Sequence, residues 1–393
     1  MADTVWHLSP ATFRIDGRII TVNGFSFSNN TQEISADGII SPDESEQLSM
    51  SFKNMNLSHL ETYLNNKLGI KGMINGTISI SDFYKSRRLD SDLQLTGFEY
   101  MDQPIGDVSL GSKWDRSTRL INGEMRIVRN GRIQTSASGY FNPENQEMDF
   151  TVDLNNQSVV ILGSVIRETM SNFHGDGTGR VRVHGTPEKI LMDGAVFCKN
   201  AGLTIDFTQV TYNFSDSVRF SGDRFIFRNI EVTDFLGNKG TFNGSIRHDS
   251  FKNMDYNLGL TSGKILALNT TMKQNESFYG KAIVRGELSI RGHDNDVKLS
   301  GSATSLPETA VTIILGDEAE VARYDFIRFV KAEKDTLPIP AFIPRQEEGG
   351  IVIDLLIHAT PEAKVQMVYN TQISDMIRAQ GDARFKPERA PNS

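Results

Sequence analysis

Residues Tyr279 to Ala303 read Y-G-K-A-I-V-R-G-E-L-S-I-R-G-H-D-N-D-V-K-L-S-G-S-A, and this stretch decides the fold. Apolar or small residues alternate with polar ones from Ala282 to Ile290, Ile283 being the one exception. This is the pattern of a β-strand with one apolar and one polar face. A polar turn follows, and the alternation resumes from Val297. The stretch therefore predicts two antiparallel strands joined by a short turn.

The same alternation recurs along nearly the whole chain, at a spacing of roughly ten residues. Asn130-Gly131 is one of several turn signals between these runs. Glycine recurs on or beside the apolar face, as in I-N-G-T-I from Ile74 and F-N-G-S-I from Phe242. A glycine within a strand marks a bend or a close approach of another backbone. We therefore predict an all-β fold: an elongated, curled antiparallel sheet with an apolar concave groove and a few short helices.

Three segments interrupt the strand pattern. The leucines between Leu57 and Leu68 have helical spacing, as do the apolar residues from Ser158 to Met170 and from Asp317 to Lys334. Residues 336–350 contain too many prolines for a central strand. The predicted organisation is β-repeats with two short helices (1–172), further β-repeats (173–316), an amphipathic helix and proline-rich loop (317–350), further strands (351–386) and a tail (387–393). The segment 317–350 is either an insertion or a lid over the groove; the lid residues would be Val321, Phe326, Phe329 and Val330.

Composition excludes several classes of protein. The 393-residue chain has a net charge of -8 and no basic face, which argues against a nucleic-acid partner. The single cysteine, Cys198, excludes a disulfide within the chain. No run of 18 apolar residues predicts a transmembrane helix, and the start is not a signal peptide. Because the strand pattern begins close to Met1, we expect the chain to be a fragment of a longer protein.

Motifs for catalysis or metal binding are missing from the sequence. The seven histidines are scattered, and no nucleotide-binding, zinc-protease or nucleophile-elbow motif appears. The glycine-rich run from Gly175 to Gly179 lacks the G-x-G-x-x-G order and is interpreted as a flexible entry into a strand. A carboxylate pair assembled from distant strands stays open. We expect a protein that is not an enzyme and that uses no cofactor or metal.

If no second protein layer covers this apolar face, it needs an apolar ligand. The residues expected to line the groove are Ile74, Ile78, Ile80, Leu93, Leu95, Met125, Ile127, Phe150, Val152, Val181, Val183, Phe242, Ile246, Tyr256, Leu258, Leu260, Val284, Leu288, Ile290, Val297, Leu299, Ile353 and Leu355.

Several runs of residues resemble a known family. G-T-G-R-V-R-V-H-G-T-P (177–187), D-F-L-G-N-K-G-T-F-N-G-S-I-R-H (234–248) and Y-G-K-A-I-V-R-G-E-L-S-I-R-G (279–292) are similar to TamB proteins of Gram-negative bacteria. The similarity is strongest to Bacteroides-type versions, within the wider AsmA-like group, and it extends over essentially the entire chain. The motifs are strand patterns rather than catalytic signatures. The chain lacks the N-terminal anchor helix of the family and stops soon after D-A-R-F-K-P, where the family continues.

This resemblance implies a long curled sheet, the β-taco, anchored in the inner membrane and crossing the periplasm. It implies movement of phospholipids to the outer membrane, or, with a TamA-type outer-membrane barrel as partner, assembly of outer-membrane proteins. We expect the first role. The alternatives are a chaperone-like role in a translocation and assembly module, in which sheet edges pair with strands of client proteins, and a non-catalytic structural or polysaccharide-binding β-repeat protein.

Overall fold

The computed structural model describes residues 5–58, 69–100, 103–160, 170–275, 278–294, 296–314, 327–329, 351–370, 375–379 and 381–385. The chain divides into two compact units. The first consists of residues 1–161 and 177–196, and the second of residues 162–176 and 197–393. The boundary passes through β12 (Met170–Thr186) and β13 (Lys189–Ile205). Each unit is described by itself.

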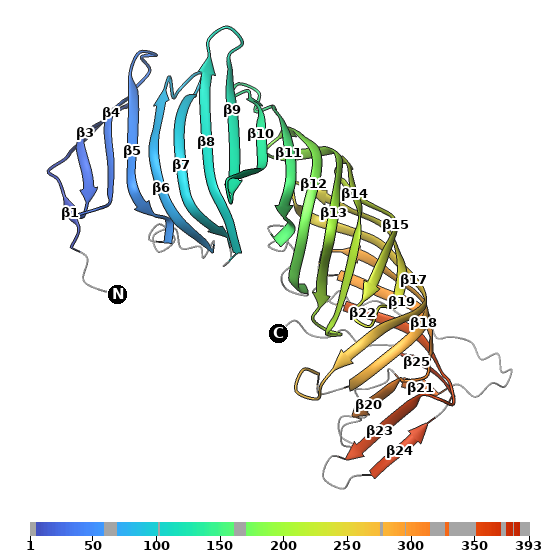
Figure 1. Ribbon diagram of the computed structural model, residues 1–393. Helices are drawn as coiled ribbons and strands as arrows, with labels where there is room; N and C mark the ends of the chain where they lie inside the picture. Colours follow the sequence, from blue (N-terminus) through green and yellow to red (C-terminus); the bar gives the residue numbers. More distant parts are fainter. Residues whose placement is uncertain are drawn as a thin grey trace. The chain divides into compact units, whose positions relative to one another are not determined.

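The first unit is an antiparallel sheet whose strands lie side by side in chain order (Figure 1). Each strand from β2 to β11 pairs with the next, and the short β1 also pairs with β3. The strands are β1 (His7–Leu8), β2 (Thr12–Asp16), β3 (Ile19–Ser28), β4 (Glu33–Ile40), β5 (Gln47–Asn56), β6 (Ile70–Ser81), β7 (Arg88–Tyr100), β8 (Gln103–Asp115), β9 (Leu120–Arg129), β10 (Arg132–Phe141) and β11 (Met148–Ser158).

Tight turns connect several of these strands, as the sequence predicts. Asn130 and Gly131 between β9 and β10 have φ angles of 52° and 71°, which identifies the turn predicted from that dipeptide. Such a turn matches the right-handed twist of the two strands that it joins. It places Val128 opposite Ile133, and a bulge between Ile133 and Thr135 then shifts the register so that Met125 lies opposite Ala137.

The second unit is also mainly antiparallel. β14 to β19 pair each with the next, while β19 and β20 are each joined by a parallel strand, β22 and β23. β24 then pairs with β23, and β25 with β21 and β22. The strands are β14 (Val210–Gly222), β15 (Arg224–Asp234), β16 (Lys239–Asp249), β17 (Lys252–Thr270), β18 (Phe278–His293), β19 (Asp296–Ser305), β20 (Ala310–Ile314), β21 (Ile327–Phe329), β22 (Ile351–Ala359), β23 (Lys364–Asn370), β24 (Asp375–Ala379) and β25 (Gly381–Phe385).

The sheet of the second unit curls on itself at one end. Two strands lie between β14 and β17 in the hydrogen-bonded order, yet the Tyr212 hydroxyl of β14 donates to the Leu266 carbonyl of β17 at 2.7 Å. Val210, Leu266 and Ile283 form one buried cluster there. β17 carries two bulges in this region, between Ser262 and Ile265 and between Leu266 and Leu268. Because a bulge increases the local twist and bends a strand, these bulges account for the curl.

These observations confirm the predicted all-β class and the antiparallel sheet, and they correct several local predictions. In the predicted helix over 317–334, residues Ile327–Phe329 form the short strand β21, and the other residues lie outside the described part. A short apolar run has no decisive period, and pairing with β25 sets its conformation here. The other two predicted helices lie mainly outside the described residues; β11 extends to Ser158 and β12 starts at Met170.

The glycine-rich run from Gly175 to Gly179 lies inside β12, and the interpretation of it as a flexible entry is therefore wrong. Glycine has no side chain, so the alternation of apolar and polar residues that predicts a strand cannot be seen in this run. A Cβ on Gly175 would lie 2.4 Å from the Cα of Ala201. The run is thus a place where two strands approach closely, which is a role of glycine within a sheet.

Candidate functional site

The predicted lining residues of the first unit all lie on one face of its sheet. Residues directly opposite each other in a ladder share a face. Leu93 of β7 lies opposite Leu110 of β8, which lies opposite Met125 of β9. The same registers place the remaining lining residues on this face: Ile74, Ile78, Ile80, Leu95, Ile127, Phe150 and Val152.

Val181 and Val183 of β12 extend the apolar face of the first unit. They alternate with Arg180 and Arg182, whose guanidinium groups pair with Asp153 and Asp149 of β11, both at 2.6 Å. Because these ion pairs lie on the polar face, the two valines point to the side of Phe150 and Val152.

The predicted lining residues of the second unit also share one face. Phe242 lies opposite Leu260, which lies opposite Leu288. The other positions on this face by register are Ile246, Tyr256, Leu258, Val284, Ile290, Val297, Leu299, Ile353 and Leu355. Among the predicted lid residues, Val321, Phe326 and Val330 lie outside the described residues, and Phe329 is part of β21.

Most of the lining side chains are only half-buried. Ile127, Val181 and Leu258 are buried, whereas the others whose side chains are described keep part of their surface exposed. Side chains on each face pack against their neighbours on the same face; in the second unit, Phe242, Leu260 and Val284 also pack against the buried cluster of Ile230, Val232 and Ile265. In each unit, the described secondary structure that carries these residues is strand alone. The two faces therefore present half-exposed apolar surface that a ligand could cover.

Glycines on these faces let neighbouring backbones approach closely. Gly76 of the first unit has a φ of 126°, and a Cβ there would lie 2.0 Å from the Asp92 carbonyl oxygen. Gly244 of the second unit has a φ of 132°, and its Cβ would lie 2.2 Å from the Asn257 carbonyl oxygen. Only glycine fits such positions. The prediction that strand glycines mark close approach is confirmed here, whereas Gly222 lies in open space.

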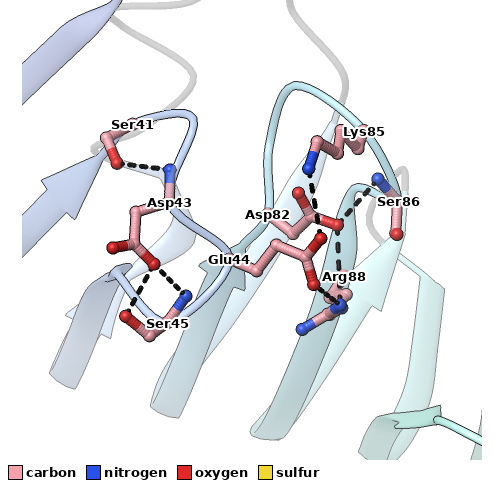
Figure 2. A network of polar contacts seen from close by, with 8 residues as sticks. All are labelled: Ser41, Asp43, Glu44, Ser45, Asp82, Lys85, Ser86 and Arg88. Atoms are coloured by element: carbon pink, nitrogen blue, oxygen red, sulfur yellow. Dashed lines mark hydrogen bonds and ion pairs between the residues drawn. The ribbon is translucent and has the colours of Figure 1, made fainter.

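A polar network lies where strands β4 to β7 end in the first unit (Figure 2). The Glu44 carboxylate accepts hydrogen bonds from Lys85 at 3.2 Å and from Arg88 at 2.9 Å. Asp82 is buried, lies 3.6 Å from Arg88, and accepts a hydrogen bond from the Ser86 amide at 3.1 Å. The Arg88 guanidinium also lies over the Trp114 ring, 5.7 Å from its centroid. Trp114 lies opposite Ile121, so the network adjoins the end of the apolar face.

Sequence reasoning missed this network. D-F-Y-K-S-R-R from Asp82 to Arg88 has the composition of an ordinary polar turn. Asp82 nevertheless has a left-handed φ of 47° and is buried. No local signal in the sequence links residues 44 and 82.

The polar face of the second unit carries a shallow hollow of about 500 Å³. It lies beside the bulge of β17 at Ser262 and Gly263 and is lined mainly by glycine, serine, threonine and charged side chains. It opens away from the apolar face, because Thr261 and Glu287, which line it, alternate with Leu260 and Leu288. An apolar chain would gain little by binding there.

Histidine and carboxylate groups meet on the polar side of the second unit. His293 contacts Asp255 at 2.6 Å and Asp294 at 3.2 Å, and the hydrogen bond to Asp255 raises the pKa of His293. The buried His248 stacks on Phe251 with ring centroids 4.9 Å apart, and burial lowers its pKa. Among the described residues, no group of three histidine, cysteine or acidic side chains could hold a metal ion.

Comparison with known proteins gives one match. Residues 228–391 match the family model of the TamB C-terminal domain. The match starts within β15 and covers most of the second unit, and it supports the TamB resemblance over these residues. No curated protein and no solved structure matched the chain. Within the described residues, no helix is long and apolar enough to span a lipid bilayer.

Proposed function

We propose that the chain holds phospholipid acyl chains against its apolar faces and moves phospholipids between the inner and outer membranes of a Gram-negative bacterium. The observation that carries this proposal is the register: half-exposed apolar side chains lie opposite one another from strand to strand, as in Phe242, Leu260 and Leu288. The TamB match is consistent with lipid transport or with a translocation and assembly module. The proposed location is the periplasm, as part of an inner-membrane-anchored protein.

The physical advantage of such a face is large. An acyl chain of about 16 carbons exposed to water is unfavourable by roughly 12 kcal/mol, at about 0.8 kcal/mol per methylene. A row of apolar side chains removes much of that barrier while the headgroup stays in water. Transfer of this kind breaks no covalent bond, so the proposal requires no catalytic residue, cofactor or metal.

Charged substitutions on the two faces test the proposal. We expect Leu93→Glu in the first unit and Leu288→Glu in the second to remove co-purified phospholipid, as measured by native mass spectrometry of protein isolated from cells. The matched controls are Gln94→Glu and Ser289→Glu, which place the same charge one residue away on the polar face. Circular dichroism checks that all four variants remain folded. Equal lipid content in the folded Leu variants and in their controls would contradict the proposal.

A second candidate function is chaperone-like pairing with strands of outer-membrane proteins, together with a TamA-like barrel. The edge of the first unit favours it. Phe13 and Ile15 of the outer strand β2 are 64% and 76% exposed, and β2 pairs within the described residues with β3 alone. An exposed edge of this kind can accept a further strand. Photocrosslinkers at Thr12 and Arg14 would distinguish the roles, because this function predicts adducts with client strands.

A further inference from the structure

A carboxylate of the protein itself, that of Glu44, occupies a position with the chemistry of an anion-binding site. Glu44, in the loop between β4 and β5, places one carboxylate oxygen 3.2 Å from the Lys85 ammonium and the other 2.9 Å from Arg88 Nη2 (Figure 2). A lysine and an arginine on two oxygens of one group is also how proteins hold a phosphate. Glu44 therefore occupies the position of a phosphate-like ligand.

The contact that holds Glu44 is exchangeable. The side chains of Glu44 and Lys85 are 51% and 63% exposed, and exposed ion pairs contribute little to stability. Hydrogen bonds from Lys85 and Arg88 lower the pKa of Glu44, so the carboxylate is charged at neutral pH. Arg88 is only 19% exposed, and its Nη2 also lies 3.6 Å from Oδ2 of the buried Asp82. An external anion can therefore displace Glu44 while Arg88 stays in place.

Three polar atoms of Arg88 and of the two residues that contact it, Asp82 and Trp114, lack partners within the described part of the chain. Arg88 Nε and Trp114 Nε1 are buried donors, and Asp82 Oδ1 is a buried acceptor; none has a hydrogen-bond partner among the residues that the structure describes. Buried polar groups in native proteins are nearly always paired, and an unpaired one is destabilising. The arrangement with Glu44 in the site thus leaves hydrogen-bonding capacity unused. A ligand that carries both acceptors and a donor would use it.

Apolar residues lie directly next to the network. Leu48, Ile80 and Leu89 lie opposite one another on β5, β6 and β7 and form the end of the apolar face at this point. Ile80 precedes Asp82 by two residues, and Leu89 follows Arg88. A molecule with a phosphate at the network would therefore have its apolar part beside the apolar face.

We propose that Lys85, Arg88 and Trp114 form a headgroup site for a phospholipid, from which the lipid phosphate displaces Glu44. This inference rests on the proposed function, because it places the headgroup of the same lipid whose acyl chains cover the face. With Glu44 in the site, the charges of Lys85, Arg88, Asp82 and Glu44 sum to zero. With Glu44 displaced they sum to +1, which complements the single negative charge of a phosphodiester.

The unpaired Asp82 oxygen adds selectivity among headgroups. It accepts a hydrogen bond from an ammonium or hydroxyl group, whereas the quaternary ammonium of choline has no N–H to donate. The site therefore favours ethanolamine over choline at equal acyl length.

Trp114 provides the readout for a test with the full chain. The protein has two tryptophans, so Trp6→Phe leaves Trp114 as the single tryptophan, whose emission is excited selectively at 295 nm or above. We expect dihexanoyl phosphatidylethanolamine to change Trp114 emission at lower concentration than dihexanoyl phosphatidylcholine, and inorganic phosphate to bind more weakly than either. In this background, Glu44→Gln should tighten binding about three- to tenfold, since it removes the competing anion. Lys85→Gln should weaken it by a similar factor, and Arg88→Gln by about tenfold or more.

Lys71→Gln is the matched control, because Lys71 forms an exposed ion pair with Glu99 at 3.8 Å, away from the network. It should leave binding unchanged. Lys85→Gln and Glu44→Gln change exposed side chains and should fold even if Arg88→Gln does not. Unchanged binding in both would overturn the headgroup site, and so would inorganic phosphate binding as tightly as the lipid. If lipid still co-purifies in that case, the proposed function survives; if the parent protein binds no lipid at all, both fail.

Discussion

The two units differ in how distant parts of each sheet are held together. In the first unit, hairpin ends are joined by exposed contacts: Glu44 with Lys85 and Arg88, and Arg18 over the Tyr84 ring at 4.3 Å. In the second unit, one such contact is buried, although exposed ion pairs such as that of Lys264 with Glu308 occur there too. The Asp234 carboxylate accepts a hydrogen bond from the Leu266 amide at 2.7 Å, in β17, 32 residues away. Exposed ion pairs can exchange partners, whereas a buried network cannot without local unfolding. We infer that the contacts of Glu44 can exchange, whereas those of Asp234 cannot without local unfolding.

The buried clusters follow the same division. The first unit has a cluster around Ile105, Val108 and Ile127. Among the described residues, the second has clusters around Leu266 and around Ile230, and together they join β14, β15, β17 and β18. These clusters stabilise the second unit through packing between strands that are not neighbours in the sheet.

Removal of Asp234 should have the largest effect. Its two oxygens accept bonds from the amides of Leu236, Asn238 and Leu266 and from the Asn238 side chain, at 2.7–3.0 Å, and the residue is 2% exposed. Asp234→Ala leaves these donors unpaired, and we expect a loss of about 3 kcal/mol or more from the unfolding free energy of the second unit. Hydrogen exchange resolved by peptide should show faster exchange in β14 to β17.

Asp43 of the first unit is the matched control for Asp234. It also accepts bonds within a turn, from the amide and hydroxyl of Ser45 at 2.8 and 2.7 Å, but its surroundings are exposed. Asp43→Ala should change exchange only in the loop between β4 and β5. Equal effects of the two substitutions would remove the contrast between buried and exposed contacts.

Glycine substitutions should have the next largest effect, and the same effect in both units. Gly76→Ala and Gly244→Ala each force a Cβ against a carbonyl oxygen of the next strand, and both backbones are in a region that alanine avoids. We expect each to lower the unfolding free energy by about 2–4 kcal/mol. Gly263→Ala is the control, since nothing lies within 4 Å of its Cβ position. Chemical denaturation of the three variants measures this, and a Gly244→Ala protein as stable as Gly263→Ala would contradict the close approach.

The Tyr212 hydroxyl should contribute less. It donates to the Leu266 carbonyl at 2.7 Å, and burial raises its pKa, so it stays protonated up to strongly alkaline pH. Tyr212→Phe removes one hydrogen bond and keeps the ring, with an expected loss of about 1 kcal/mol. Arg18→Ala, which removes the exposed contact to Tyr84 in the first unit, should leave the denaturation midpoint almost unchanged. If Arg18→Ala were the more damaging, the exposed contacts would be the stronger ones.

The apolar faces could be predicted from the sequence because alternation is local. Leu93 and Met125 belong to different strands, yet each is placed on its face by its immediate neighbours. The turn at Asn130-Gly131 sets the register of β9 and β10 only up to the bulge after Ile133. The position of Asp234 in D-F-L-G-N predicts a turn, which is its local role. Its hydrogen bond to the Leu266 amide depends on the bulged strand β17, 32 residues later in the chain. No local sequence pattern predicts this contact.

Other features could not be predicted for the same reason. The parallel pairing of β22 with β19 joins strands whose sequences look like the rest of the sheet. The Glu44 network depends on two hairpin ends that meet through the register of β5 and β6. Strand pattern thus predicts which residues share a face, while contacts between hairpin ends need the three-dimensional structure.

A change of pH should alter the stability of the second unit and leave that of the Glu44 loop in the first unit unchanged. This should be the smallest effect of the series. The hydrogen bond to Asp255 raises the pKa of His293 above its unfolded value near 6.5. The contribution of His293 to stability is therefore fully present below about pH 6.5 and is lost as the pH rises through the folded pKa. Burial shifts the pKa of His248 in the opposite direction, so this residue opposes folding as the pH falls below about 6.5. Glu44 in the first unit, with its lowered pKa, stays charged throughout this range.

Imidazole chemical shifts followed from pH 5 to 9 should therefore give a midpoint above 6.5 for His293 and below 6.5 for His248. His293→Gln should remove the stabilisation of the β17–β18 hairpin at pH 6 and have less effect at pH 9, whereas exchange in the loop around Glu44 should be the same at both values. The two histidines change the stability of the same unit in opposite directions as the pH falls. The unfolding midpoint of the intact protein therefore shows less than the full contribution of either one. A midpoint for His293 at or below 6.5 would show that Asp255 does not hold the protonated ring in solution.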